Sequence, residues 1–65
     1  MPDVHISWVE GRTVEQKRKV AERITQILTE EVGAKPESTH TVFLDIPATS
    51  FASGGMLVAD KNKKA

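Results

Sequence analysis

Apolar and polar residues alternate near the start of the chain. Val4, Ile6 and Trp8 are apolar and are separated by single polar residues. This period of two predicts a strand with one apolar face over residues 3–9. Pro2 shares the parity of the apolar residues and lies at the edge of that face. Proline is tolerated at the first residue of a strand because it has no ladder donor to lose.

The spacing changes to a helical one after the loop formed by residues 10–12. Thr13 followed by Gln16 fits a capping box, so Thr13 is the predicted N-cap. Gly33 suits the position just after a helix, and the sequence predicts a helix over residues 14–32. Its apolar residues recur on one stripe. They are Val20, Ile24, Ile27, Leu28 and Val32.

A second strand is predicted over residues 40–46, and Pro47 ends it. Its apolar run, residues 42–44, indicates burial on both faces, as in a parallel pair. The helix, about 28 Å long at 1.5 Å per residue, returns the chain to the start of a parallel neighbour by a right-handed crossover. We expect an α/β fold, a β-α-β unit with a short C-terminal strand or hairpin at residues 56–59. Residues 1–65 form a single domain, with 60–65 a frayed polar tail.

The length of 65 residues limits the core of one chain. A chain this short buries only about 60% of its unfolded surface, and small scaffolds usually need disulfides, a metal or partner subunits. The sequence has no cysteine and only two histidines, so neither disulfides nor a metal site is expected to stabilise the fold. Self-association is the remaining means of stabilisation. We expect copies to pair at strand edges and to stack on the sheet face left open by the helix, with Phe43 on that face.

Charge and hydropathy restrict the partners. Nine basic and nine acidic residues cancel, which argues against binding to nucleic acid or to an anionic membrane. No apolar run approaches the roughly 20 residues of a membrane span, and no signal-peptide pattern opens the chain. The expectation is a soluble cytoplasmic protein.

Candidate chemistry begins at Pro2, which directly follows Met1. Removal of Met1 would make the Pro2 nitrogen a secondary amine. An α-amino group titrates near 8, and an apolar surrounding that includes Phe51, together with a nearby Arg12, would lower the pKa towards that of an effective base. Arg12 also has a planar guanidinium group that can donate two parallel hydrogen bonds to a carboxylate.

Several short motifs together carry a resemblance to a known family. They are Met1-Pro2, the run Val9-Glu10-Gly11-Arg12-Thr13 followed by Glu15-Gln16-Lys17, the strand end Asp45-Ile46-Pro47, and Phe51 followed by Gly54-Gly55. With them the chain resembles the 4-oxalocrotonate tautomerase family over about residues 2–55. The resemblance implies a homohexamer, a trimer of dimers with sites at subunit junctions, that uses no metal or organic cofactor.

The resemblance also implies roles for single residues. Pro2 would be the general base that moves a proton between carbons of an enol or dienol acid such as 2-hydroxymuconate. Arg12 would bind a substrate carboxylate, often from a neighbouring subunit, and Phe51 would form the aromatic wall of the pocket. The family usually has a second arginine where this chain has His40. A histidine reaches less far and is only partly charged near pH 7, so His40 would suit a smaller or monocarboxylic substrate.

Each candidate also has a purely structural interpretation. Arg12 alone would be a solvated loop charge, Phe51 and Trp8 would be packing residues, and His40 would be peripheral. Two functional alternatives stay open beside the tautomerase. One is a non-catalytic oligomeric or small-acid-binding module. The other is a related hydratase or dehalogenase in which Pro2 is a protonated acid.

Overall fold

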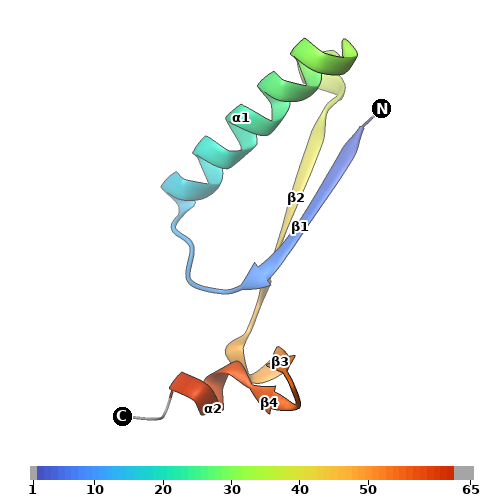
Figure 1. Cartoon of the computed structure of the whole chain (residues 1–65). Helices are drawn as coiled ribbons and strands as arrows, with labels where there is room; N and C mark the ends of the chain where they lie inside the picture. Colours follow the sequence, from blue (N-terminus) through green and yellow to red (C-terminus); the bar gives the residue numbers. More distant parts are fainter. Residues whose placement is uncertain (1, 63–65) are drawn as a thin grey trace.

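The computed structural model describes residues 2–62 and shows one long helix packed on a two-stranded sheet, followed by a small C-terminal arm (Figure 1). The elements, in chain order, are β1 (Asp3–Val9), α1 (Val14–Val32), the 3₁₀ turn η1 (Pro36–Ser38), β2 (His40–Ile46), the 3₁₀ turn η2 (Ala48–Ser50), β3 (Ala52–Ser53), β4 (Met56–Leu57) and α2 (Val58–Asn62).

The sheet is parallel, as the sequence predicts. Asp3 of β1 lies opposite His40 of β2, and the register continues to the last residues of both strands. The ladder extends by one bond at its first end, where the His40 N–H donates to the Pro2 carbonyl at 3.0 Å. Helix α1 connects the two strands and covers one face of the sheet (Figure 1). The predicted β-α-β unit is therefore confirmed.

Both ends of α1 are set by local sequence, and both were predicted. The Thr13 hydroxyl accepts from the Gln16 N–H at 3.1 Å, and the Gln16 side chain accepts from the Thr13 N–H at 2.9 Å. This reciprocal pair satisfies two backbone donors of the first turn. At the other end Gly33 adopts φ +72°, and its N–H donates to the Thr29 carbonyl at 3.2 Å. A glycine reaches this left-handed conformation without the steric cost of a Cβ.

The apolar stripe of α1 is narrower than predicted. Val20, Ile24 and Leu28 are half-buried, one helical turn apart. Ile27 and Val32 belong to the predicted stripe but are exposed, at 55% and 68%. A two-stranded sheet is narrow, so it covers one row of helix side chains and leaves the next row free.

Phe43 lies on the face of the sheet that α1 covers, so its predicted place on the open face is wrong. The register puts Phe43 opposite Ile6, and its ring stacks on that of Trp8 with 5.4 Å between centroids. Since side chains alternate along a strand, the neighbours Val42 and Leu44 point to the other face, and both are exposed. On the open face β2 therefore exposes the large apolar residues Val42 and Leu44.

The C-terminal arm differs in part from the prediction. The expected strand over residues 56–59 is confirmed only at β4, which pairs with β3 in an antiparallel hairpin. The turn between them is Gly54-Gly55, with φ of +61° and +83°. Residues 58–62 form α2, so the predicted frayed tail does not include residues 60–62. The rest of that tail, residues 63–65, lies outside the described residues.

The described part of a single chain is extended and lacks a buried interior. Its extents are 46 × 23 × 15 Å and its radius of gyration is 15.4 Å, against about 11 Å for a compact 65-residue domain. None of the residues from 2 to 61 is fully buried, and several large apolar side chains are exposed. Such a chain needs further surface to pack against. Within the same residues, neither helix combines the length and apolarity needed to cross a bilayer.

Candidate active site

The sheet divides the predicted site residues into two groups at opposite ends. Pro2 and His40 lie where the parallel strands begin, and Arg12 and Phe51 follow the ends of β1 and β2. The seven residues of β1 separate the two groups by about 20 Å, at ~3.3 Å per residue. In Figure 1 the amino terminus and the β1 arrowhead mark these two ends. One chain therefore does not bring Pro2 and Arg12 together. That Arg12 lies near Pro2, from a neighbouring subunit as the resemblance implied, stays a prediction.

The first group includes a residue that sequence analysis missed. The Asp3 carboxylate lies 3.0 Å from His40 Nδ1, and both side chains are about half exposed. A carboxylate can only accept, so the hydrogen of this bond belongs to His40 Nδ1. The contact orients the imidazole and leaves Nε2 for another partner. The parallel register, which places Asp3 opposite His40, creates this pair.

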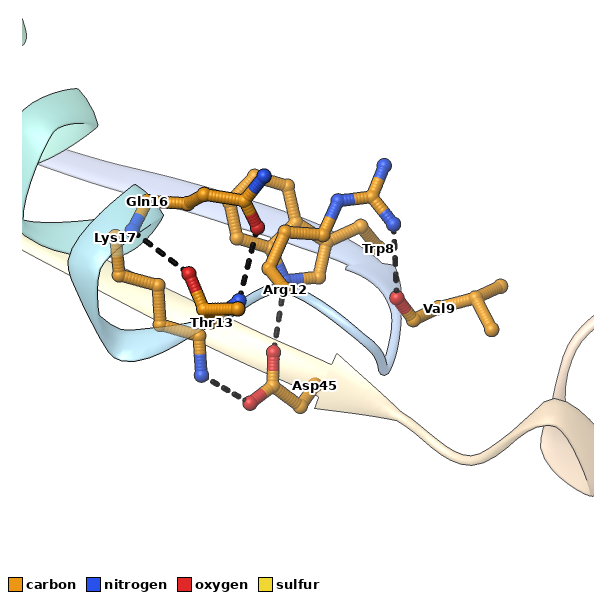
Figure 2. Close-up of polar contacts among 7 residues, drawn as sticks. All are labelled: Trp8, Val9, Arg12, Thr13, Gln16, Lys17 and Asp45. Carbon is orange, nitrogen blue, oxygen red and sulfur yellow. Dashed lines mark hydrogen bonds and ion pairs between the residues drawn. The ribbon is translucent and has the colours of Figure 1, made fainter.

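The second group is built around Arg12. The chain leaves β1 through Gly11, whose φ of +133° favours glycine. Arg12 Nη1 then donates back to the Val9 carbonyl at 3.2 Å, and Cζ lies 4.9 Å from the centroid of the Trp8 ring. Figure 2 shows the Arg12 side chain beside this indole. The guanidinium is thus held by one hydrogen bond and one cation–π contact.

Trp8 is connected to the rest of the fold through Asp45. Trp8 Nε1 donates to Asp45 Oδ1 at 2.7 Å, and Lys17 of α1 forms an ion pair with Asp45 Oδ2 (Figure 2). The hydrogen bond from Lys17 lowers the pKa of the Asp45 carboxyl most, followed by that from Trp8; the charges of Lys17 and Arg12 act in the same direction. In the sequence alone Trp8 has the pattern of a packing residue and Asp45 has no predicted role, because only the register shows that the two are opposite each other.

The lowered pKa of Asp45 predicts a pH-dependent effect of its removal. A carboxylate with a lowered folded-state pKa stabilises the fold above its unfolded pKa, about 3.9, and loses that contribution as the pH falls through the folded pKa. We expect Asp45→Asn to lower the thermal midpoint at pH 7. The difference from the unsubstituted protein should shrink steadily as the pH falls below about 4.

Circular dichroism melts between pH 7 and pH 3 measure this difference. Glu22→Gln is the matched control, because it removes an exposed carboxylate of α1 away from the sheet. The Asp45→Asn deficit should exceed that of the control at pH 7. A deficit of equal size at pH 7 and at pH 3 would show that the ionised pair has no part in stability.

No pocket forms among residues 2–62 of a single chain. Phe51, the predicted aromatic wall, is 38% exposed, and its carbonyl accepts from the Val58 N–H at 2.8 Å, which ties η2 to α2. Its side chain is therefore available at the surface of the arm. Within the described residues of one chain, the two groups of site residues therefore do not line a common cleft.

Comparison with known proteins identifies the family. The model of the tautomerase enzyme family matches residues 2–61. A probable tautomerase of Lactococcus lactis subsp. lactis is 41% identical over 64 residues, which covers 98% of this chain and 100% of that relative. A solved 4-oxalocrotonate tautomerase isozyme from Methylibium petroleiphilum has a TM-score of 0.85 and 37% identity, over 95% of this chain and 100% of that chain. A solved 4-oxalocrotonate tautomerase homologue, TTHB242, has a TM-score of 0.89 and 27% identity, over 92% and 95%.

The chain belongs to the tautomerase family, within its 4-oxalocrotonate tautomerase group. The resemblance drawn from the sequence motifs is confirmed, together with the β-α-β fold that it implied. Membership supports an isomerase-type enzyme of the tautomerase class.

Proposed function

We propose that this protein tautomerises a small enol or dienol carboxylic acid, such as 2-hydroxymuconate, with Pro2 as the general base after removal of Met1. The observation that carries the proposal is the position of Pro2. It is half-exposed, and its carbonyl is held in the sheet ladder by the His40 N–H at 3.0 Å. The ring nitrogen is therefore held at a defined point of the fold, as proton transfer requires.

The proposed reaction needs only one group that accepts and returns a proton. The Pro2 amine takes the proton of the 2-hydroxyl group, and the electron pair of that O–H bond forms the carbonyl. The electrons of the substrate's diene shift along its carbon skeleton. The Pro2 ammonium then returns the proton to the carbon at the far end of the diene. A base works best when its pKa lies near the ambient pH, and an α-amino group, near 8 when unperturbed, is close to this condition.

Substrate binding in this proposal comes from a neighbouring copy of the chain. Arg12 would bind the carboxylate, and Phe51 would cover the reacting carbons. Three observations support an assembled site: the separation of Pro2 from Arg12 along β1, the exposed Val42 and Leu44 on the open sheet face, and the lack of a buried interior in one chain. We propose a homohexamer built as a trimer of dimers, the arrangement that the family resemblance implied.

His40 would provide a weaker anion contact than a second arginine. Its Nδ1 is held by Asp3, so Nε2 is the atom available to a substrate oxygen. Such a contact suits a smaller or monocarboxylic substrate better than a six-carbon dicarboxylate. Among the substrates accepted, monocarboxylic ones should therefore be favoured relative to 2-hydroxymuconate.

Two measurements on purified protein test the proposal. Intact mass should show loss of one methionine, and the trimmed protein should tautomerise 2-hydroxymuconate and the monocarboxylic phenylenolpyruvate, with kcat/KM rising as a group deprotonates near neutral pH. His40→Ala should lower kcat/KM by about tenfold, the loss of one hydrogen bond to a charged group. Activity that falls on deprotonation would instead favour the hydratase or dehalogenase alternative. Trimmed protein with no turnover of either acid would favour a binding module.

A further inference from the structure

Arg12 is held in place by contacts within its own chain. It lies in the loop between β1 and α1, where an arginine side chain otherwise samples many rotamers. Here Nη1 is bonded to the Val9 carbonyl, and Cζ lies 4.9 Å from the Trp8 ring centroid. A guanidinium has five N–H donors, and the bond to Val9 uses one. The remaining donors suffice for a bidentate carboxylate contact.

Trp8, which supports Arg12, is fixed by two contacts to β2 and is connected through Asp45 to α1. Its Nε1 donates to Asp45 of β2 at 2.7 Å, and its ring stacks on Phe43 of the same strand. Lys17 of α1 binds the second oxygen of Asp45. The indole therefore has little freedom to rotate, and the Arg12 guanidinium rests on a rigid surface.

The ion pair with Lys17 also matters for the charge of this cluster. The Asp45 carboxylate is close enough to Arg12 for the Arg12 charge to help lower its pKa. An unpaired carboxylate at this position would compete with a substrate carboxylate for the guanidinium. Lys17 and the Trp8 N–H occupy the two oxygens of Asp45, so Arg12 stays available.

We infer that Trp8 is a positioning residue for anion binding. Its ring, anchored through Asp45 to Lys17, holds the Arg12 guanidinium in the geometry that receives the substrate carboxylate. Preorganisation of this kind increases affinity because less side-chain freedom is lost on binding. The inference rests on the proposed function in one respect, the assignment of the carboxylate to Arg12. It adds a determinant of affinity that lies outside the predicted site residues.

The sequence supplies a direct probe, because Trp8 is its single tryptophan. Emission excited at 295 nm therefore reports on this ring alone, and a cation at its face affects that emission. We expect Arg12→Ala to change the emission of the ligand-free protein. We also expect cis,cis-muconate, a dicarboxylate without the reactive hydroxyl group, to change the emission of the unsubstituted protein on titration.

Calorimetric titration with cis,cis-muconate measures the contribution of the ring to affinity. Loss of one exposed cation–π contact corresponds to about a fivefold rise in the dissociation constant for Trp8→Leu. Trp8→Phe keeps an aromatic face and should recover most of the affinity. Ile6→Val is the matched control, because it trims a half-buried residue on the same face of β1 and should leave the dissociation constant unchanged. In turnover, Trp8→Leu should raise KM and leave kcat within about twofold, since a uniform binding contact is lost.

Three outcomes would overturn the inference. They are a Trp8→Leu protein that binds muconate as tightly as the unsubstituted one, emission that saturating muconate leaves unchanged, and no binding of muconate at all. If the Trp8→Leu protein does not assemble, the affinity of Trp8→Phe for muconate and the emission of the unsubstituted protein test the inference instead. Failure of the proposed function gives a different result. If muconate binds with the expected variant effects but neither enol acid is turned over, the proposed proton transfer is contradicted and the inference about Trp8 is not.

Discussion

A chain that carries one extra glycine before Pro2, with Met1 removed, is expected to lose activity by a factor of about 10² to 10⁴, the usual contribution of a general base. The added residue makes the Pro2 nitrogen an amide, which has no basicity. The ring remains, and so does the carbonyl that accepts from the His40 N–H. The change therefore removes the proton acceptor while it keeps the ladder of the sheet.

The measurement is kcat/KM on 2-hydroxymuconate and phenylenolpyruvate, with intact mass to establish the N-terminus of every preparation. Trimmed Pro2→Ala is the matched control, because it keeps a basic terminal amine without the ring and should lose less activity than the glycine-extended chain. Thermal melts should show that both proteins remain folded. If the glycine-extended protein turns over as fast as the trimmed one, Pro2 is not the base.

The second large effect is expected when two chains with different, individually damaging defects are combined. Arg12→Ala should lose about 30-fold or more in kcat/KM, the cost of removing one partner of a charged contact. The glycine-extended chain loses activity for a different reason, because its Pro2 nitrogen is an amide. Because β1 separates Pro2 from Arg12 by about 20 Å, each defect lies in a different part of the chain. A site formed between subunits can then take an intact Pro2 from one chain and an intact Arg12 from the other.

Much of the fold could be predicted because it is encoded locally. The change from a period of two to helical spacing locates β1 and α1, and Thr13 with Gln16 and Gly33 set the helix ends by hydrogen bonds within a few residues. The C-terminal arm was less predictable. Met56 to Ala59 have strand-like composition, but only two of these residues pair, because the hairpin partner β3 is only two residues long.

The candidate site residues can be recognised one by one in the sequence, but their arrangement in space cannot. Pro2 and Arg12 carry recognisable chemistry in the sequence, yet their separation follows from the length and direction of β1. The Asp3–His40 and Trp8–Asp45 contacts depend on the register between two strands 37 positions apart. Phe43 shows the same limit, because a continuous apolar run does not show which residue points towards the helix. Contacts that depend on the register cannot be predicted from the sequence of either strand alone.

Joint refolding of the glycine-extended chain with Arg12→Ala, followed by an assay of 2-hydroxymuconate tautomerisation, tests directly whether the site is shared between chains. Random assembly of equal amounts places both intact groups together in about a quarter of two-chain sites, so the mixture should recover about that fraction of the unsubstituted activity. Each chain refolded alone should keep only its own low activity, and the two refolded chains mixed without denaturation should show no more than the average of the two. A refolded mixture no more active than the average of its two components would contradict a site built from Pro2 of one subunit and Arg12 of another.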